Sequence, residues 1–516
     1  MSYHLVKYFA AFLPLVIIVY QLVPKKFRFI VMLAADYLFF FLFSKWLVAY
    51  LLMSTVITHF VALWLERADA TALADSGKQT SRKRRILAVG ILSNLGVLIV
   101  LKYFNFLGSN AVGLVNLFGA DVTFNAVGFL VPIGISYYTL EIIGYLTDVY
   151  RNTQKAEHNF AKTALFLSFF PQIMEGPICR FNQTADKLYE GEGIRYINLK
   201  HGYQRILWGL VKKIIIADRL APAVSEIFNS YSQMSGFYVI AGAALYTCQL
   251  YMEFSGCMDI IIGTGEIFGI NLPENFRQPF LAKNASEFWR RWHITLGTFF
   301  KDYIFYTVSL AKPVKNFAKK VKNRFGRNVS KFVAPTIALF CVWSCNGLWH
   351  GAKWTYIFYG MYYFVIIFIE NITEAPIEKL TSKLKINRES KIYRAFQAVK
   401  LFLIVIVGEL FFRADTVKDG FLMIGRVFTD FGFNTIVSDY GMLGLDVSDW
   451  VIVALGVLAV SVVGIFHEKG ISVRTEISKW STPVRWIFWY AGIMAVVFLG
   501  AYGFGYTAVD LIYAGY

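Results

Sequence analysis

Long apolar stretches, separated by short polar segments, recur along the whole chain. A helix needs roughly 20 apolar residues to cross the ~30 Å hydrocarbon core of a bilayer. Because a helix satisfies its own backbone hydrogen bonds inside lipid, we predict an all-α polytopic membrane protein. The apolar runs place its helices at residues 5–23, 28–43, 46–65, 86–107, 126–147, 160–178, 203–217, 237–262, 332–350, 353–370, 396–413, 450–466 and 485–506.

Two of these segments are interrupted by polar residues and helix breakers. The interruptions are Pro132, Gly134, Glu141 and Asp148 within residues 125–150, and Pro171, Glu175, Gly176 and Pro177 within residues 169–180. Non-helical backbone at membrane depth is tolerated only where it is buried in protein or lines a water-filled cavity. We therefore expect about eleven true membrane spans around a central block of tilted, re-entrant elements.

Composition supports the membrane assignment. Of the 516 residues, 57% are hydrophobic and 16% are charged, whereas soluble proteins carry about 25% charged residues. The first apolar run is followed by Lys25, Lys26 and Arg28 and not by a small-residue cleavage site. It is therefore expected to be the first membrane helix, with no cleaved signal peptide.

The distribution of charge indicates how the chain crosses the membrane. The net charge of +17 gathers in short basic loops, among them residues 67–85 and 311–329, while residues 108–125 contain no Lys or Arg. Basic loops stay in the cytoplasm, so topology explains this charge and no nucleic-acid partner is expected. For part of this positive charge, the alternative is a binding site for an anionic donor. Residues 372–400, of mixed charge, predict a pair of amphipathic surface helices.

The five cysteines do not form a metal-type C-x-x-C pair. Cys341 and Cys345 are one helical turn apart and lie shortly before His350, so a metal site has to be considered. A fourth ligand is not apparent, and small thiols packed between helices explain the pair better. We predict no metal.

Two of the seven histidines lie in surroundings suited to a site. His350 ends an apolar run between Trp349 and Gly351, and Asn346 lies one turn earlier on the same face. A glycine lets backbone approach the ring closely, and an imidazole inside a membrane is costly unless it is used. The structural alternative is a histidine that merely hydrogen-bonds to a neighbouring helix.

His293 follows Arg290 and Arg291, and Trp292 and Trp289 are placed to form walls around it. The same structural alternative applies to it with more force than to His350. Two non-metal histidines among aromatic residues suit acyl transfer, in which one ring is the general base for a hydroxyl and the other positions a donor or polarises its carbonyl.

Other chemistries lack their motifs in this chain. There is no G-x-S-x-G elbow, no H-E-x-x-H signature, no phosphate-binding loop and no dinucleotide fingerprint. A thioester donor needs no covalent enzyme intermediate and no bound cofactor. A transporter or channel remains the alternative from a different class, with Glu141, Glu175 and Asp259 as its coupling groups.

Several motifs in a fixed order resemble the membrane-bound O-acyltransferase family. The resemblance runs from about Tyr103 to Asp415, and within the family it is closer to the bacterial alginate O-acetylation branch than to the teichoic-acid D-alanylation branch. Its carriers are Phe170-Pro171-Gln172, Gly176-Pro177-Ile178 with Arg180, Phe254-Ser255-Gly256 with Asp259, Leu272-Pro273, Asn275-Phe276, Pro279-Phe280, Phe288-Trp289-Arg290-Arg291-Trp292-His293 and Leu348-Trp349-His350-Gly351.

The resemblance implies a ring of membrane helices around a thinned core with a tunnel. It also implies that His350 is the catalytic base and His293 the second active-site histidine. Substrate-binding residues are expected at Asn346, Trp349, Trp292, Arg290, Arg291, Ser255, Asp259, Glu175 and Arg180. The expected division is N-terminal membrane helices in residues 1–107, a catalytic core in 108–415 and C-terminal membrane helices in 416–516.

By the same resemblance, the chain moves an acyl group, expected to be acetyl, across a bacterial plasma (inner) membrane. The donor is a cytoplasmic thioester, acetyl-CoA or an acyl carrier protein. The acceptor is an extracytoplasmic polysaccharide or cell-wall polymer, reached through an SGNH-hydrolase-like partner. The enzymatic alternative is D-alanyl transfer from a carrier-protein thioester to teichoic acid. Departures from the family pattern at Glu253, Cys257 and Tyr363 leave the acceptor open.

Overall fold

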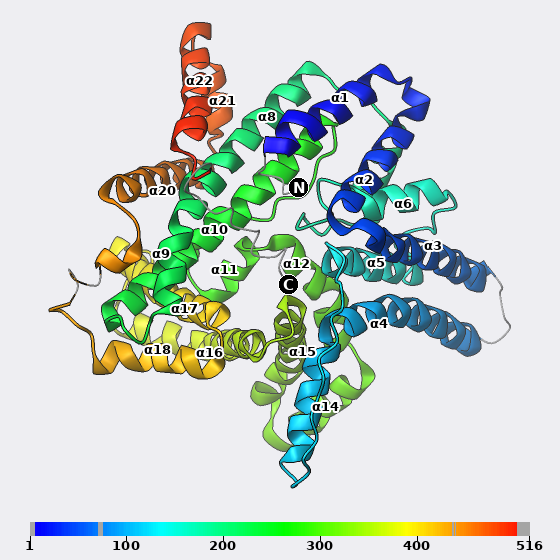
Figure 1. The fold of residues 1–516 in the computed structure, drawn as a ribbon. Coiled ribbons are helices and arrows are strands. Elements are labelled where there is room, and N and C mark those ends of the chain that lie inside the picture. The colour runs from blue at the N-terminus through cyan, green and yellow to red at the C-terminus, as the bar shows by residue number, and fades with distance from the viewer. Residues whose placement is uncertain (1–5, 71–75, 436–437, 439, 503–516) are drawn as a thin grey trace. The chain divides into compact units, whose positions relative to one another are not determined.

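The computed structural model describes residues 6–70, 76–435, 438 and 440–502 (Figure 1). These residues form helices joined by turns and loops, and the described chain contains no β-strand beyond one isolated bridge between Phe276 and Trp292. The all-α prediction is confirmed. Backbone contacts divide the chain into two compact units, each described by itself below.

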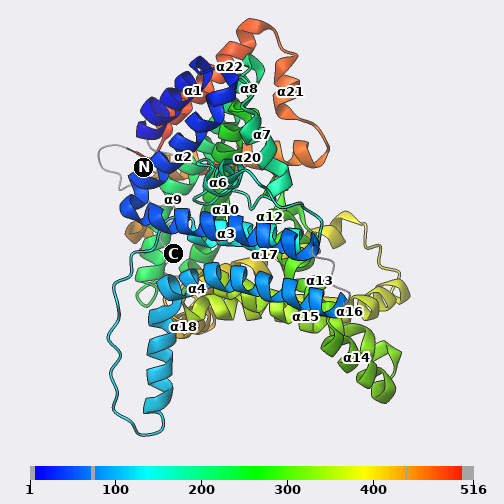
Figure 2. The same ribbon diagram turned by 90° about the vertical axis from the view of Figure 1, so that its right-hand side faces the viewer.

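The first unit comprises the described parts of residues 1–206 and 261–273. Within it, α3 and α4 lie side by side (Figure 2). Its elements are η1 (Tyr8–Phe12), α1 (Leu13–Leu22), η2 (Lys25–Phe27), α2 (Arg28–Ser44), η3 (Lys45–Leu47), α3 (Val48–Ala70), α4 (Ser76–Asn116), α5 (Ile135–Tyr150), α6 (Phe160–Ser168), α7 (Phe181–Glu190), most of α8 (Tyr196–Leu210) and the end of α10 (Gly236–Ile267).

The helix predicted at 126–147 begins later than expected, because α5 starts at Ile135. Gly134 precedes it with φ +68°, a left-handed conformation that residues with a side chain rarely adopt. A Cβ atom at Gly134 would also lie 1.8 Å from the carbonyl oxygen of Ile173. A close approach to the segment around Ile173 thus ends the extended stretch and sets the start of α5.

The helix predicted at 160–178 is short as well, because α6 ends at Ser168 and residues 169–180 are irregular. Two buried carboxylates accept the hydrogen bonds of this stretch. Asp36 accepts from the backbone N–H of Phe170 at 2.8 Å, and Glu141 accepts from that of Cys179 at 3.1 Å. Residues 169–179 are buried throughout, as expected for broken backbone in a membrane protein.

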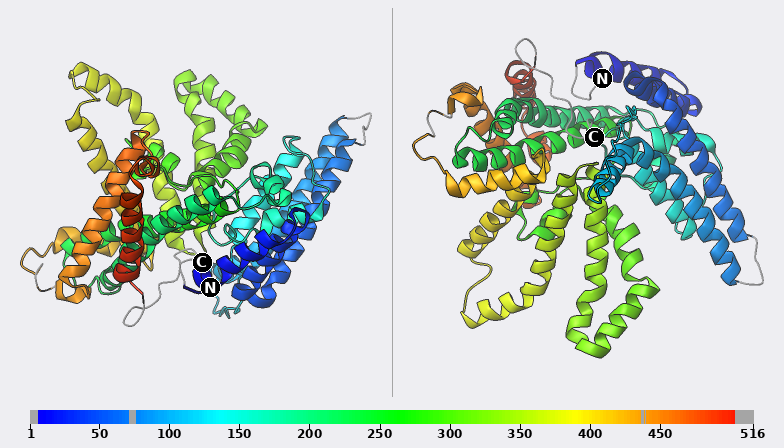
Figure 3. Two further views of the ribbon diagram at one scale, coloured as in Figure 1. Left: turned by 90° about the horizontal axis from the view of Figure 1, so that it is seen from above. Right: turned by 60° about the horizontal axis from the view of Figure 1, so that its bottom comes forward.

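The second unit comprises residues 207–260 and the described residues from 274 onward. In Figure 3 its paired long helices, α14 with α15 and α16 with α17, project as hairpins. Its elements are η4 (Val211–Ala217), α9 (Asp218–Asn229), most of α10, η5 (Pro279–Leu281), α11 (Ala285–Arg291), α12 (Ile294–Phe300), η6 (Lys301–Phe305), α13 (Tyr306–Ser309), α14 (Lys312–Phe325), α15 (Arg327–His350), α16 (Trp354–Lys383), α17 (Lys391–Arg413), α18 (Val417–Thr429), η7 (Gly441–Leu443), α20 (Val447–Glu468), α21 (Val473–Ser478) and α22 (Thr482–Leu499).

Three segments expected to lie outside the long helices belong wholly or partly to them. Of residues 67–85, predicted as a basic loop, residues 67–70 end α3 and residues 76–85 begin α4. Residues 311–329, predicted as a basic loop, form α14 and the start of α15. Val314, Ala318 and Val321 recur at helical spacing and are the partly covered side chains of α14. Residues 372–400, predicted as a separate amphipathic pair, are the end of α16 and the start of α17.

A hydrophobic core of the second unit gathers around the π-helix η4. Ile214, Ile215 and Ile216 are buried there with Val453 and Val460 of α20. A Cβ atom at Gly456 would lie 2.8 Å from a Ile216 side-chain carbon, so α20 packs closely on η4. This core fixes α20 against the part of the chain that leads into α9 and α10.

Seven described helical segments are long and apolar enough to cross a membrane, and Tyr8–Leu22 is a shorter apolar helix. The number of true spans stays a prediction. The seven are Lys25–Asp69, Gln79–Asn116, Arg327–His350, Trp354–Lys383, Lys391–Arg413, Val447–Glu468 and Thr482–Leu499.

Candidate active site

His293 lies at the junction of α11 and α12 in the second unit. It is the residue before α12 and has φ +47° and ψ +52°, an uncommon left-handed conformation for a residue with a side chain. Such strain gathers at functional sites and persists only where the surroundings fix it. The bridge between Phe276 and Trp292 and the bond from the Ile294 N–H to the Asn275 carbonyl, at 3.0 Å, fix it from both sides.

The side chain of Asn275 organises the polar groups around His293. Its Oδ1 accepts from the Thr295 N–H at 3.0 Å and from the Thr295 hydroxyl at 2.8 Å, while its Nδ2 donates to Met258 Sδ at 3.2 Å. Because a backbone N–H can only donate, the Asn275 atom that faces Thr295 is the amide oxygen. His293 Nδ1 lies 3.4 Å from the same Oδ1. We assign the proton to Nδ1, facing this oxygen, which leaves the lone pair on Nε2.

His293 is buried among aromatic rings. The Phe254 ring lies perpendicular to the imidazole with centroids 4.8 Å apart, and the Trp349 ring lies 5.6 Å away. Burial lowers the pKa of His293 from 6.5 to about 3, since it disfavours the imidazolium. The ring is neutral at physiological pH. Its Nε2 is buried and has no hydrogen-bond partner among the described residues.

His350 is the last residue of α15 and is also buried, with 5% of its surface exposed. Phe412 lies perpendicular to its ring at 5.0 Å between centroids, and Tyr359 does so at 5.9 Å. A Cβ atom at the next residue, Gly351, would lie 2.7 Å from the Tyr356 ring. The glycine therefore allows the chain to turn tightly from α15 towards α16 beside this histidine.

Trp349 joins the two histidines. Its ring lies 5.6 Å from the His293 ring and 5.1 Å from the His350 ring, centroid to centroid. Residues 57 positions apart in the sequence thus contact one indole. Trp292, the other predicted wall residue, is buried and stacks on Phe288 at 5.4 Å.

Sequence reasoning missed a buried pair beside His350. The hydroxyl of Tyr359 donates to Glu409 Oε1 at 2.9 Å, and Glu409 is 1% exposed. Tyr359 also contacts the His350 ring, so this tyrosine links the Glu409 carboxyl group to that imidazole. The signal was present in the sequence, because Glu409 interrupts the apolar run 396–413 and a carboxyl inside a membrane helix indicates function.

Ser255 and Asp259 lie one turn apart on α10 and share a partner. Lys212 Nζ donates to the Ser255 hydroxyl at 3.1 Å and forms an ion pair with Asp259. Lys212 belongs to the π-helix η4, an irregularity that often marks functional sites. Sequence reasoning missed this lysine, although Lys212 and Lys213 stand out as adjacent cations within the apolar run 203–217.

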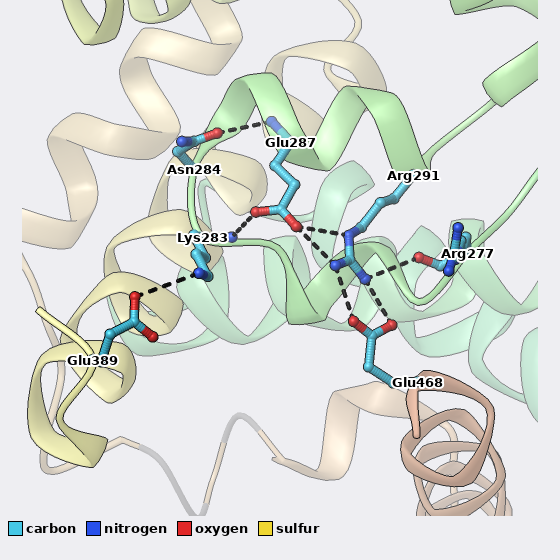
Figure 4. Close-up of polar contacts among 7 residues, drawn as sticks. All are labelled: Arg277, Lys283, Asn284, Glu287, Arg291, Glu389 and Glu468. Carbon is cyan, nitrogen blue, oxygen red and sulfur yellow. Dashed lines mark hydrogen bonds and ion pairs between the residues drawn. The ribbon is translucent and has the colours of Figure 1, made fainter. Parts of the chain in front are cut away.

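Arg290 and Arg291 have different surroundings. The side chain of Arg290 is exposed. Arg291 donates to Glu287 Oε1 from Nη2 at 2.7 Å and to both carboxylate oxygens of Glu468, at 2.8 and 3.0 Å (Figure 4). Burial pushes the pKa of the Glu287 carboxyl upward, but the Lys283 N–H and the Arg291 guanidinium outweigh it and leave this pKa below its usual value.

The remaining predicted residues are placed as follows. Asn346 is buried on α15, one turn before His350, and its Oδ1 has no hydrogen-bond partner in the described part of the chain. Glu175 and Arg180 belong to the first unit. Glu175 is buried in the irregular stretch, and Arg180 precedes α7 with its N–H donating to Gln183 Oε1 at 2.8 Å. Across the described residues, no group of three or more His, Cys, Asp or Glu side chains is placed to hold a metal ion.

The chain is similar to one protein family and to several individual proteins. The profile of MBOAT, the membrane-bound O-acyltransferase family, matches residues 37–411. The probable alginate O-acetylase of Azotobacter vinelandii is 32% identical over 418 residues, which cover 81% of this chain and 76% of that protein. The peptidoglycan O-acetyltransferase of Helicobacter pylori is 31% identical over 350 residues, covering 62% and 60%. The teichoic acid D-alanyltransferase of Bacillus subtilis is 29% identical over 263 residues, covering 48% and 60%.

Proposed function

The chain belongs to the membrane-bound O-acyltransferase family and is a multi-pass membrane O-acyltransferase, and from this premise we propose that it transfers acetyl groups to an extracytoplasmic polymer. The donor is a cytoplasmic thioester, acetyl-CoA, and the membrane is the bacterial inner membrane. The observation that carries the proposal is that two buried histidines, His293 and His350, both contact the ring of Trp349.

The reaction assigns His350 the role of general base. An acceptor hydroxyl oxygen attacks the thioester carbonyl carbon while His350 takes the hydroxyl proton. The new C–O bond forms, the C–S bond breaks, and the thiolate leaves and receives the proton from the imidazolium. A positioned base of this kind contributes about 10²–10⁴-fold to the rate.

The sequence left open whether the second histidine positions the donor or polarises its carbonyl. In this proposal His293 only accepts a hydrogen bond. Its Nδ1–H points to Asn275, so its Nε2 accepts hydrogen bonds and, while the ring is neutral, does not donate to a carbonyl oxygen. We assign it to accept a hydrogen bond from the acceptor hydroxyl or another substrate donor. Polarisation of the thioester carbonyl is assigned to other groups.

The other predicted site residues support this arrangement in different ways. Asn346, Trp349 and Trp292 are assigned as substrate contacts, and Ser255 and Asp259 act through their bonds to Lys212. Arg290, which is exposed, is the cation assigned to an anionic donor group. Glu175 and Arg180 keep their proposed substrate roles in the first unit.

The acceptor and partner are proposed by similarity. The alginate O-acetylase relative and the peptidoglycan O-acetyltransferase relative both carry names of polymer O-acetylation. We propose a polysaccharide or cell-wall polymer as acceptor, reached through an SGNH-hydrolase-like partner outside the membrane. No bound cofactor is needed. The transporter alternative is not retained, because the family is one of acyltransferases.

D-alanyl transfer is the second candidate, favoured by the teichoic acid D-alanyltransferase relative. Purified protein in lipid nanodiscs, given either radiolabelled acetyl-CoA or an acylated carrier protein, separates the two. We expect label transfer from acetyl-CoA that is lost in His350→Ala and kept in His158→Ala, a surface histidine. Transfer from the carrier protein alone would establish the second candidate instead, and an active His350→Ala enzyme would remove His350 as the base.

A further inference from the structure

The side chain of Arg291 is committed to two carboxylates. Its Nε and Nη2 donate to Glu287 Oε1 at 3.0 and 2.7 Å, within α11. Its Nη1 and Nη2 donate to the two oxygens of Glu468 at 2.8 and 3.0 Å, a paired arrangement that a lysine could not reproduce (Figure 4). A third contact reaches the carbonyl of Arg277 at 3.5 Å. This guanidinium is therefore occupied by protein groups.

The backbone at Arg291 leads directly into the His293 conformation. Its carbonyl accepts from the Arg277 N–H at 2.9 Å, Trp292 forms the bridge to Phe276, and His293 follows in its left-handed conformation. Movement of Arg291 reaches the imidazole through the extended backbone of Trp292 and the left-handed backbone of His293. Positioning errors of about 1 Å in a catalytic group can cost about 100-fold in rate.

Glu468 is well placed to hold Arg291, because α20 is fixed at its other end. Asp449 in the first turn of α20 pairs with Arg219 of α9, and Val453 and Val460 are buried in the core around η4. The last residue of α20 is Glu468. This helix lies outside residues 37–411, the part that the family profile matches.

We propose that Glu468 is a positioning residue for acyl transfer and that it acts through Arg291 on His293. Helix α20 then contributes to catalysis, and Arg291 is a structural cation with no role in donor binding. This inference rests on the proposed function, because it assumes that His293 serves the reaction. It departs from the sequence-based assignment of Arg291 to the substrate.

The test uses Glu468→Gln, Arg291→Gln and the double variant in the full-length protein, assayed for acetyl transfer. We expect Glu468→Gln to lower kcat about tenfold with an unchanged KM for the donor, and the double variant to be no slower than Arg291→Gln alone. The pair is partly exposed, with 18% and 34% of the two side chains accessible, so the Tm should change little. Arg291→Lys should not restore the rate, since it lacks the paired donors.

Glu476→Gln is the matched control. Glu476 lies on the neighbouring helix α21, and the substitution breaks its exposed ion pair with Lys479. It should leave kcat at the wild-type value. A wild-type kcat in Glu468→Gln would overturn the proposal, as would a raised donor KM in Arg291→Gln with kcat unchanged. An active His350→Ala enzyme would instead refute the proposed function, so the two failures are distinguishable.

Discussion

Asp36 in the first unit and His293 in the second unit differ in how their buried polar atoms are satisfied. In the first, Asp36 accepts from the Phe170 N–H and the Ser168 hydroxyl, so its carboxylate serves the backbone. In the second, His293 Nε2 and Tyr363 Oη are buried and have no partner among the described residues. An unpartnered buried polar atom costs about 1–3 kcal/mol. The Asp36 carboxyl therefore supports the backbone of the first unit, whereas we propose that the open nitrogen of His293 meets a substrate group.

The contrast is sharpest for His350→Ala, for which we expect the largest effect. Acetyl transfer should fall by about 10²–10⁴-fold, because the general base is lost. The Tm should change by only a few degrees, since α15 keeps its other contacts. Turnover of radiolabelled acetyl-CoA and thermal unfolding of the same nanodisc sample measure the two quantities. A collapse of the Tm with proportional loss of activity would assign His350 to the fold.

Asp36→Ala should show the reverse pattern. Removing the carboxylate leaves the Phe170 N–H buried without its 2.8 Å acceptor, so we expect a loss of about 1–3 kcal/mol in the free energy of unfolding. Asp121→Ala, at an exposed position in the loop before α5, is the matched control. Thermal unfolding checks both variants. A wild-type Tm in Asp36→Ala would contradict a supporting role for this carboxylate.

Tyr359→Phe should slow acetyl transfer, but by less than His350→Ala does. It removes the 2.9 Å donor to Glu409 and keeps the ring against His350. We expect kcat to fall about tenfold, which is roughly 1.4 kcal/mol in the transition state, with donor KM unchanged. Tyr362→Phe, which removes only a bond to the Ile404 carbonyl, is the control. Equal rates in the two variants would show that the Glu409 pair has no part in catalysis.

The last expected effect is a dependence of stability on pH. The pKa of His293 is about 3 in the folded chain and near 6.5 when unfolded, so between these values only the unfolded chain binds the proton. Stability should therefore fall as the pH drops below about 6.5, by at most about 1.4 kcal/mol per pH unit. His293→Asn should show a flatter curve of Tm against pH between 7.5 and 5. Parallel curves would mean that the ring is not held neutral by burial.

The helical class and the irregular buried segment could be predicted from sequence alone, and the two histidines could be singled out as candidates, because each has a local signature. Apolar runs, proline and glycine breaks, and imidazoles among aromatic residues can be identified without tertiary information. Helix boundaries failed where a remote contact decides them, as at Gly134 against Ile173. α14 was missed although Val314, Ala318 and Val321 recur at helical spacing, because its high charge was interpreted as a loop.

The partners within the site could not be predicted, because they depend on which helices meet. Lys212 contacts Ser255 and Asp259, which lie 43 and 47 positions later in the sequence. Tyr359 contacts Glu409, which lies 50 positions later. No local pattern specifies such pairs. The roles of the predicted site residues remain proposals to be settled by the variants above.

The protonation state of His293 depends on Asn275 as well as on the histidine itself. Its amide oxygen orients His293 without supplying a negative charge, so nothing opposes the effect of burial on that ring. A carboxylate in its place, as in Asn275→Asp, would favour the imidazolium and convert an acceptor of hydrogen bonds into a donor. A residue that never titrates thus decides how many protons the site holds when substrate arrives.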